Sequence, residues 1–139
     1  MDVKVLVWVT SPHACKVILN EAKRYADRTG GRLIVVSIQS PITSDWAGKL
    51  RDLELLNRAA KEFDAELTVQ YSDNTLKAAY NIIKNLEPTC MFTGIPEAGM
   101  RSAFVENICS MAENTPVYTV DKHGNAGRVN KLGSSSDAE

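Results

Sequence analysis

The strongest constraint on the fold is a repeated alternation of short apolar runs with longer amphipathic segments. Residues 3–9 and 33–38 are nearly continuous apolar runs rich in β-branched side chains, a pattern typical of strands buried on both faces of a parallel sheet. Further runs follow at residues 65–71, 90–94 and 116–120. Because helix-period segments separate consecutive runs, the sequence predicts a doubly wound three-layer α/β/α sandwich with a five-stranded parallel sheet.

The segments between the runs carry apolar residues every three or four positions, which predicts amphipathic helices. Trp46 and Leu50 belong to the apolar positions of the second segment and Leu76 to those of the third. Ser11 is placed as an N-cap and Pro12 as a first helical residue, where its missing N–H costs nothing. Residues 65–71 alternate apolar and polar side chains, which favours an edge strand with one wet face. We expect helices at about residues 12–28, 45–63, 75–86 and 102–113.

Length and composition favour one ordinary domain. The chain has 139 residues, of which 44% are hydrophobic and 24% charged, with a formal net charge of −1. Nothing in this balance favours nucleic acid or anionic lipid as a partner, and no apolar run reaches the roughly 18 residues of a membrane span. We therefore expect a cytoplasmic domain over residues 1–120, followed by a flexible tail over residues 121–139 that is poor in apolar side chains.

Several ligand and catalytic classes lack their sequence signatures. Neither G-x-G-x-x-G nor G-x4-G-K-[ST] occurs, which excludes the usual dinucleotide and P-loop phosphate sites. The first strand ends in Thr10 rather than in an acidic residue, so the metal site of a receiver domain is missing. The two histidines, His13 and His123, complete no recognisable triad or zinc site. We expect no metal and no catalysis.

Cys15 and His13 each allow two interpretations. Cys15, Cys90 and Cys109 are an odd number without metal-ligand spacing, which favours reduced thiols. Cys15 falls in the first turn of a predicted helix, where a thiol pKa can be lowered, so it is either reactive or an ordinary buried thiol. His13 lies beside the expected crevice and is either a ligand contact or a solvated loop residue.

The segment from Cys90 to Ile108 is the best candidate for a binding site. A buried strand is followed by a loop with two glycines, Gly94 and Gly99, and then by a helix that starts near Ser102. Loops at the carboxyl ends of parallel strands hold ligands, because backbone N–H groups and a helix N-terminus converge there. Arg101 and this helix start are able to bind one anion, although the two glycines also suit a plain tight turn.

The chain resembles the universal stress protein family over roughly residues 3–120. The resemblance rests on Val5 to Ser11 followed at once by a helix, on Gly31 to Ile38, and on Gly94 at the end of the fourth strand. Thr10 to His13 and Arg101 to Glu106 are most similar to the stress-protein domain of Kdp-type potassium-sensing histidine kinases. The resemblance implies an adenine nucleotide α-hydrolase-like fold with strand order 3-2-1-4-5.

The resemblance also implies an adenine-nucleotide site with a shortened phosphate loop. Members that bind ATP carry Gly-x2-Gly-x9-Gly followed by Ser or Thr, whereas here four residues separate Gly94 from Gly99 and the final glycine is missing. Glu97 adds a negative charge where a triphosphate needs donors, which favours adenosine, AMP or a small anion over ATP. The nucleotide-binding residues that the resemblance implies are Val9, Thr10, Ser11, Ile38, Gly94, Gly99, Arg101, Ser102 and Ala103.

These observations lead to one main hypothesis and two alternatives. The main one is a non-enzymatic, stress-protein-like sensor or regulatory module with a degenerate adenine-nucleotide site. The family resemblance implies a homodimer through the last strand, Pro116, Val117, Tyr118, Thr119 and Val120, whose open edge needs a partner. The alternatives are a protein-interaction module without a small ligand, and an enzyme that hydrolyses or transfers at a nucleotide α-phosphate.

Overall fold

The computed structural model describes residues 3–9, 12–39, 46–94, 103–121 and 123–129. Strands and helices alternate along the chain as far as β5, and one further strand follows. The elements are β1 (Lys4–Trp8), α1 (Pro12–Thr29), β2 (Arg32–Gln39), α2 (Trp46–Glu62), β3 (Glu66–Tyr71), α3 (Thr75–Leu86), β4 (Cys90–Gly94), α4 (Ala103–Met111), β5 (Val117–Val120) and β6 (Ala126–Arg128).

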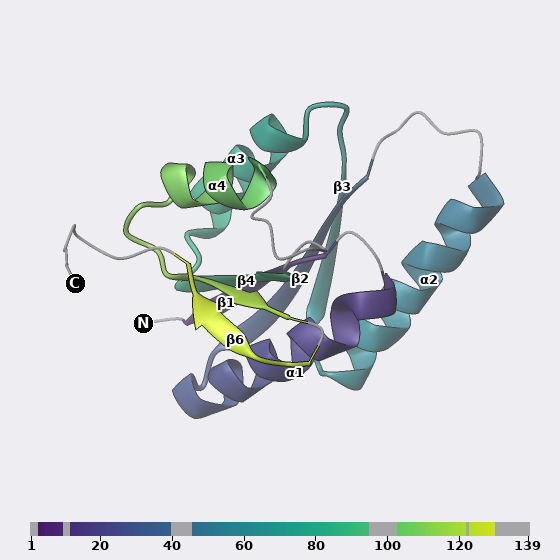
Figure 1. Cartoon of the computed structure of the whole chain (residues 1–139). Helices are drawn as coiled ribbons and strands as arrows, with labels where there is room; N and C mark the ends of the chain where they lie inside the picture. The colour runs from purple at the N-terminus through teal and green to yellow at the C-terminus, as the bar shows by residue number, and fades with distance from the viewer. Residues whose placement is uncertain (1–2, 10–11, 40–45, 95–102, 122, 130–139) are drawn as a thin grey trace.

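The elements form three layers around one twisted sheet (Figure 1). The strand order is β3-β2-β1-β4-β5-β6, with β1 to β5 parallel and β6 antiparallel to β5. Helices α1 and α2 cover one face of the sheet, and α3 and α4 cover the other. The structure thus confirms the predicted sandwich and the strand order 3-2-1-4-5, and it adds a sixth strand.

Strand β1 lies at the centre of the sheet and belongs to both halves of the core. Its odd-numbered residues Val5 and Val7 face α1 and α2, whereas Leu6 and Trp8 face α3 and α4. All four are buried, because a central parallel strand is covered on both faces. On the second face the Trp8 ring meets Phe104 of α4 edge-on, with ring centroids 5.5 Å apart.

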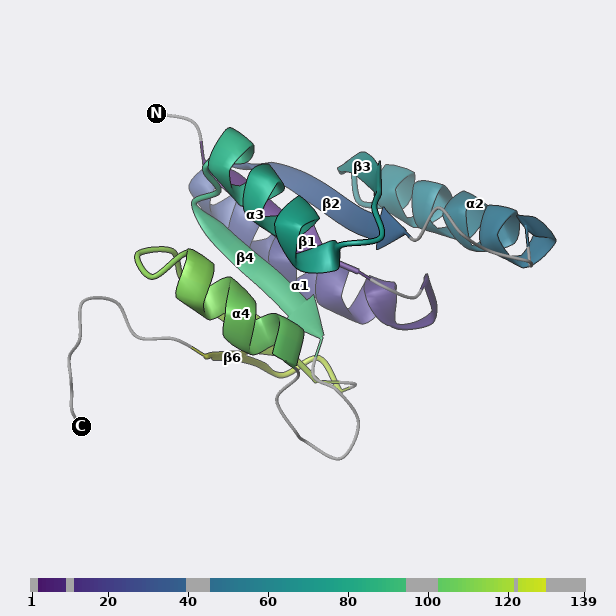
Figure 2. The ribbon, with the colours of Figure 1, turned by 90° about the horizontal axis from the view of Figure 1, so that it is seen from above.

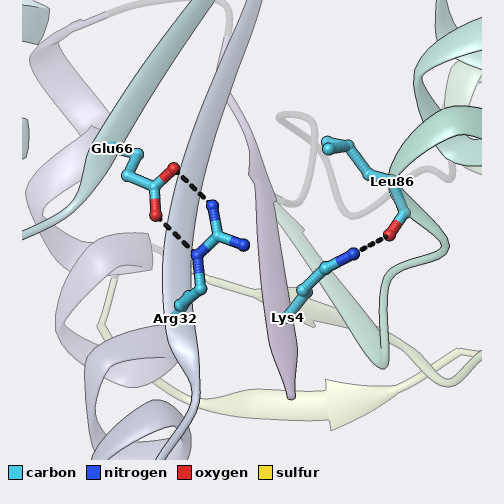
Figure 3. A network of polar contacts seen from close by, with 4 residues as sticks. All are labelled: Lys4, Arg32, Glu66 and Leu86. Carbon is cyan, nitrogen blue, oxygen red and sulfur yellow. Dashed lines mark hydrogen bonds and ion pairs between the residues drawn. The ribbon is translucent and has the colours of Figure 1, made fainter. Parts of the chain in front are cut away.

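Polar contacts join the strands at their amino ends. Figure 3 shows Arg32, at the start of β2, donating two hydrogen bonds of 2.8 and 2.7 Å to the carboxylate of Glu66, at the start of β3. Lys4, at the start of β1, donates from Nζ to the Leu86 carbonyl at the end of α3, at 2.9 Å, where a cation also complements the helix dipole. These contacts therefore tie β2 to β3 and β1 to α3 at the amino ends of the strands, away from the carboxyl ends where the predicted site lies.

Two predicted helix faces differ from the observed ones. Sequence periodicity placed Trp46 and Leu50 of α2 and Leu76 of α3 on inward faces, but their side chains are 54%, 62% and 38% exposed. In α3 the buried residues are Ala78, Ala79 and Ile82, of which Ala79 and Ile82 belong to the core on this face of the sheet. In the parts of the chain that the structure describes, every helix is too short or too polar to cross a membrane.

Strand β6 was not anticipated. It lies within the segment that the sequence predicted as a flexible tail, and it pairs with β5 through Thr119 and Gly127 at its centre. Residues 130–139 of that predicted tail lie outside the described residues. The predicted dimer edge, residues 116–120, already has β4 on one side and β6 on the other. Pairing through that edge stays a prediction, and it now requires β6 to move or to become the paired strand.

Candidate functional site

The described residues of the predicted site gather at the carboxyl ends of the central strands. Trp8 pairs with Val36 of β2 on one side and with Thr93 of β4 on the other. Val9 and Gly94 each follow these paired residues directly, and the Val9 amide donates to the Val36 carbonyl at 3.0 Å. The structure therefore brings Val9 beside Gly94, at the strand ends where the predicted site was placed.

This place is the topological switch point of the sheet. From β1 the chain builds outward through β2 and β3, and it then returns to build β4 and β5 on the other side. Helices α1 and α4, which follow β1 and β4, accordingly lie on opposite faces (Figure 2). Open α/β sheets in general bind ligands outside the carboxyl ends of the strands at such a switch point.

Two helices begin at this edge. Helix α1 starts at Pro12, as predicted, and α4 starts at Ala103, one residue after the predicted start. The N–H groups in the first turn of each helix, which in α1 begin after Pro12, lack intrahelical acceptors and carry the positive end of the helix dipole, which favours an anion. The remaining predicted contacts, Thr10, Ser11, Gly99, Arg101 and Ser102, lie outside the described residues.

Gly94 has a packing role as well as a place in the predicted site. A Cβ built on Gly94 would lie 3.2 Å from Cδ1 of Ile18, a buried residue of α1. That distance is shorter than an ordinary van der Waals contact, so the glycine lets α1 lie close against the end of β4. Ile38, the predicted neighbour of the base, is half-buried in β2 and packs against the core on the α3 and α4 face.

Sequence reasoning missed two buried hydroxyls near this edge. Ser37 of β2 is fully buried, and its Oγ accepts a hydrogen bond from Nε2 of Gln39. Thr93, the neighbour of Gly94, is 7% exposed. The available signal was a hydroxyl residue inside an otherwise apolar strand, close to its carboxyl end. A buried polar group needs a partner, and for Ser37 the Gln39 side chain supplies it.

The turn after β5 reaches toward the start of α1. Asp121 Oδ1 accepts hydrogen bonds of 2.9 Å from the amides of His123 and Asn125. The hydrogen bonds from Asn125 and His123 lower the pKa of the Asp121 carboxyl. Gly124 in the same turn approaches Val17 of α1, since a Cβ there would lie 3.9 Å from Val17 Cγ1. The carboxylate of Asp121 is thus engaged in holding the turn.

Metal-ligand groupings and the Cys90 thiol bear on the chemistry that the described residues allow. Among the described residues, no three His, Cys, Asp or Glu side chains are grouped as metal ligands. Burial raises the pKa of the Cys90 thiol to about 12, so this thiol is protonated and a poor nucleophile. The backbone amides in the first turns of α1 and α4 suit a small anionic ligand.

Comparison with solved structures shows which known proteins share this fold. A universal stress protein from Archaeoglobus fulgidus superposes with a TM-score of 0.66 and 15% identity, covering 86% of this chain and 93% of that chain. A universal stress protein in complex with cAMP gives 0.63 and 16%, covering 87% and 98%. The A. fulgidus protein in complex with dAMP gives 0.61 and 16%, covering 86% and 97%.

The chain matches no protein-family model and no curated protein. At the identities found, the structural likeness shows the fold alone, because one fold can host unrelated activities. The fold is that of universal stress proteins, adenine nucleotide α-hydrolase-like, and two structures of that fold were solved with adenine nucleotides, cAMP and dAMP.

Proposed function

We propose that this chain is a non-enzymatic regulatory module that binds an adenine nucleoside or nucleoside monophosphate at the switch point between β1 and β4. The observation that carries the proposal is the meeting of Val9 and Gly94 at this point, between the starts of α1 and α4. Structures with the same fold hold cAMP and dAMP, which are monophosphates of the proposed class.

The proposed ligand carries at most one phosphate. The loop between Gly94 and Ser102 is about six residues shorter than the pattern of ATP-binding stress proteins, and Glu97 contributes a negative charge. A triphosphate needs several donors to offset its charge. Arg101 and the start of α4 supply enough donors for one phosphate group.

A signalling role for the module is supported by the sequence. Thr10 to His13 and Arg101 to Glu106 resemble the stress-protein domain of potassium-sensing histidine kinases. Such a module reports ligand occupancy to a partner protein and needs no chemical turnover. We propose in addition that it works as a homodimer, with the last strands of the sheet as the family-implied interface.

A thermal-shift titration with AMP, cAMP, adenosine and ATP, with and without magnesium, tests the proposal. A ligand at about 100 times its dissociation constant adds roughly 2.7 kcal/mol to stability, which raises the melting temperature by several degrees for a domain of this size. AMP or cAMP should give this shift, and ATP should give less. A larger shift with ATP than with AMP would contradict the shortened phosphate site.

Arg101→Ala separates phosphate recognition from nucleoside recognition. Loss of a charge-assisted hydrogen bond should weaken AMP binding by about tenfold or more, while adenosine binding stays the same. Arg58→Ala, which removes an exposed arginine from α2, is the matched control and should change neither affinity. Equal loss of AMP and adenosine binding in Arg101→Ala would show a structural role instead.

The alternative of a protein-interaction module is favoured by exposed apolar residues on α2, Trp46 and Leu50. It predicts no thermal shift with any nucleotide. The enzymatic alternative predicts sustained release of pyrophosphate from ATP, which a coupled phosphate assay would detect. Either result would replace the proposed function.

A further inference from the structure

Two tyrosines and two arginines form a row between α1 and the last two strands. The Tyr25 ring of α1 and the Tyr118 ring of β5 have their centroids 6.1 Å apart. The guanidinium carbon of Arg28 lies 5.5 Å from the Tyr25 centroid. In the sheet, Tyr118 is the register partner of Arg128 of β6. We call Tyr25, Arg28, Tyr118 and Arg128 the tyrosine–arginine row.

The side chains of the row share one face of the sheet. Tyr25 and Tyr118 both pack against the core layer that lies under α1. Directly opposed residues of an antiparallel strand pair project their side chains from the same face, so Arg128 belongs to the same face as Tyr118. The Val129 amide donates to the Val117 carbonyl at 2.8 Å and fixes this register.

The two tyrosine rings are fixed from below. Both side chains are half-buried, and the Tyr25 hydroxyl hydrogen-bonds to the sulfur of Cys90. The Tyr118 ring stacks on the Phe92 ring, with centroids 5.0 Å apart. Rings that are already ordered lose little conformational entropy when a partner binds, so the row is a preformed contact surface.

The arginines of the row carry charge that the rest of α1 does not balance. The other Lys and Arg residues of α1 are in ion pairs, namely Lys16–Glu62, Lys23–Asp27 and Arg24–Glu21, at 3.2, 3.4 and 3.2 Å. Arg28 and Arg128 are exposed, and neither forms an ion pair with any residue that the structure describes. The row therefore presents two positive charges to a partner.

A partner that complements the row carries carboxylates. A guanidinium group binds a carboxylate through two parallel hydrogen bonds, and it keeps these donors while it stacks on an aromatic ring. The half-buried tyrosine rings between the charges suit an aromatic side chain. Three contacts of roughly 5–6 Å each put the two guanidinium groups no more than roughly 17 Å apart. About five residues of extended chain cover that length at ~3.3 Å per residue.

We propose that the tyrosine–arginine row binds an extended acidic segment of a partner protein, with carboxylates on Arg28 and Arg128 and an aromatic side chain against the two tyrosines. This segment lies on the face of β5 and β6, so it leaves the outer edge of β6 open for strand pairing. Arg28 is in the last turn of α1, whereas the proposed nucleotide site is at the first turn. The proposal therefore does not depend on nucleotide binding.

The test uses a fluorescein-labelled peptide, Gly-Glu-Glu-Phe-Glu-Glu-Gly, and fluorescence anisotropy with the whole chain. Wild-type protein is expected to bind it with a dissociation constant of about 100 μM in about 20 mM salt. The peptide with Gln in place of each Glu keeps the shape and loses the charge, so it should bind at least about tenfold more weakly. About 0.2 M salt should weaken binding of the Glu peptide several-fold.

Substitutions of the two arginines assign the binding to the row. Arg28→Ala and Arg128→Ala should each weaken binding of the Glu peptide by about fivefold to tenfold, and the double variant should abolish it at about 1 mM protein. Arg58→Ala, at an exposed arginine of α2, is the matched control and should leave the affinity unchanged. Circular dichroism checks that each variant is folded.

Arg28→Lys separates recognition from a helix-end role. Arg28 also complements the negative end of the α1 dipole, a role that needs no partner. Lysine keeps the charge and loses the planar pair of donors. Arg28→Lys should therefore keep the wild-type melting temperature and bind the Glu peptide several-fold more weakly.

Three results would overturn the proposal. They are an absence of Glu-peptide binding at about 1 mM wild-type protein, equal affinities for the Glu and Gln peptides, and a double variant that binds as wild type does. An equal loss in Arg58→Ala and Arg28→Ala would show a non-specific charge effect and overturn it too. No nucleotide is present in these measurements, so this proposal and the proposed function fail separately.

Discussion

Cys90 shows how burial decides the chemistry of a single residue. The first residue of β4 is fully buried, and the Tyr25 hydroxyl hydrogen-bonds to its sulfur. Tyr25 also packs against Phe92 and Tyr118, whose rings stack with centroids 5.0 Å apart. Burial raises the pKa of the Cys90 thiol to about 12, and the hydrogen bond from Tyr25 offsets this in part. Cys90 is therefore a core residue, a small apolar side chain rather than a reactive thiol.

This thiol should resist alkylation until the chain unfolds. In a Cys15→Ala/Cys109→Ala background, iodoacetamide at about pH 8.5 should label Cys90 at least about 100-fold faster in denaturant than in native buffer, because only the thiolate reacts and only opening exposes it. Mass spectrometry of timed samples measures the rates, and the variant that also carries Cys90→Ala is the blank. Equal rates in both conditions would contradict the buried assignment.

The raised pKa of the Cys90 thiol predicts how the free energy of unfolding changes at alkaline pH. The native thiol keeps its proton to about pH 12, whereas the unfolded thiol loses it near its ordinary value of 9.0. The unfolded state then binds fewer protons, so the free energy of unfolding falls as the pH rises from 9.0 toward about 12. Cys90→Ala should remove this part of the pH dependence in urea titrations, whatever its effect at neutral pH.

At the scale of single elements, the β5–β6 hairpin depends on the short turn that Asp121 holds. The Asp121 amide donates to the Asn125 carbonyl, and the Asp121 side chain accepts from the amides of His123 and Asn125. Beyond the turn, the Val129 amide donates to the Val117 carbonyl at 2.8 Å. The three residues of β6 are exposed, so backbone hydrogen bonding rather than apolar burial holds the strand.

Asp121→Ala should loosen this hairpin without unfolding the domain. The amides of His123 and Asn125 lose their acceptor, so their hydrogen exchange should accelerate several-fold, while amides in β1 keep their protection. Asp52→Ala, at an exposed position in α2, should change nothing. Exchange measured by NMR distinguishes the two variants, and unchanged exchange at both amides would contradict the role of Asp121.

Acidification should loosen the hairpin as the Asp121→Ala substitution does. Hydrogen bonds to its carboxylate hold the pKa of Asp121 below its ordinary value of 3.8. The contribution of the turn is therefore complete above that ordinary value and is lost as the pH falls through the lower native pKa. The protection of the two amides, corrected for the intrinsic pH dependence of exchange, should fall on acidification in wild type, whereas in Asp121→Ala it should already be low and stay unchanged.

At the scale of the whole molecule, the sheet joins two apolar layers into one core. Each side of β1 contributes to one layer, Val5 and Val7 to the first and Leu6 and Trp8 to the second. Because both layers pack on β1, one layer cannot separate from β1 without disturbing the other. We therefore expect the domain to unfold in one transition. The exposed part of α2, in contrast, adds little to this core.

Leu6→Ala and Leu50→Ala test this contrast with the same change of side chain. Leu6 is 0% exposed and Leu50 is 62% exposed. Leu6→Ala should lower the free energy of unfolding by about 2–5 kcal/mol, whereas Leu50→Ala should change it by no more than about 0.5 kcal/mol when measured below the concentration at which the chain associates. Urea denaturation followed by Trp fluorescence and by far-UV circular dichroism measures both. Transitions that differ between the two signals would contradict a single core.

The sequence by itself determined which segments become β1 to β5 and α1 to α4, and thereby the class of fold. These elements are specified by hydrophobic periodicity, which is a property of neighbouring residues. The edge position of β3 followed from its alternation of apolar and polar residues. The placement of Val9, Ile38 and Gly94 near one edge followed from the resemblance and from their positions at the carboxyl ends of predicted strands.

Only the tertiary structure decided which of these surfaces are covered. Leu50 and Leu76 lie on periodic apolar faces, yet they are exposed, because periodicity orients a helix and does not supply the neighbour that covers it. Strand β6 left no apolar signal in Ala126, Gly127 and Arg128, since its pairing with β5 uses backbone groups that every residue possesses. Likewise, the packing of Ile18 against Gly94 joins residues 76 positions apart, a contact that exists only when α1 and β4 have been brought together by the fold.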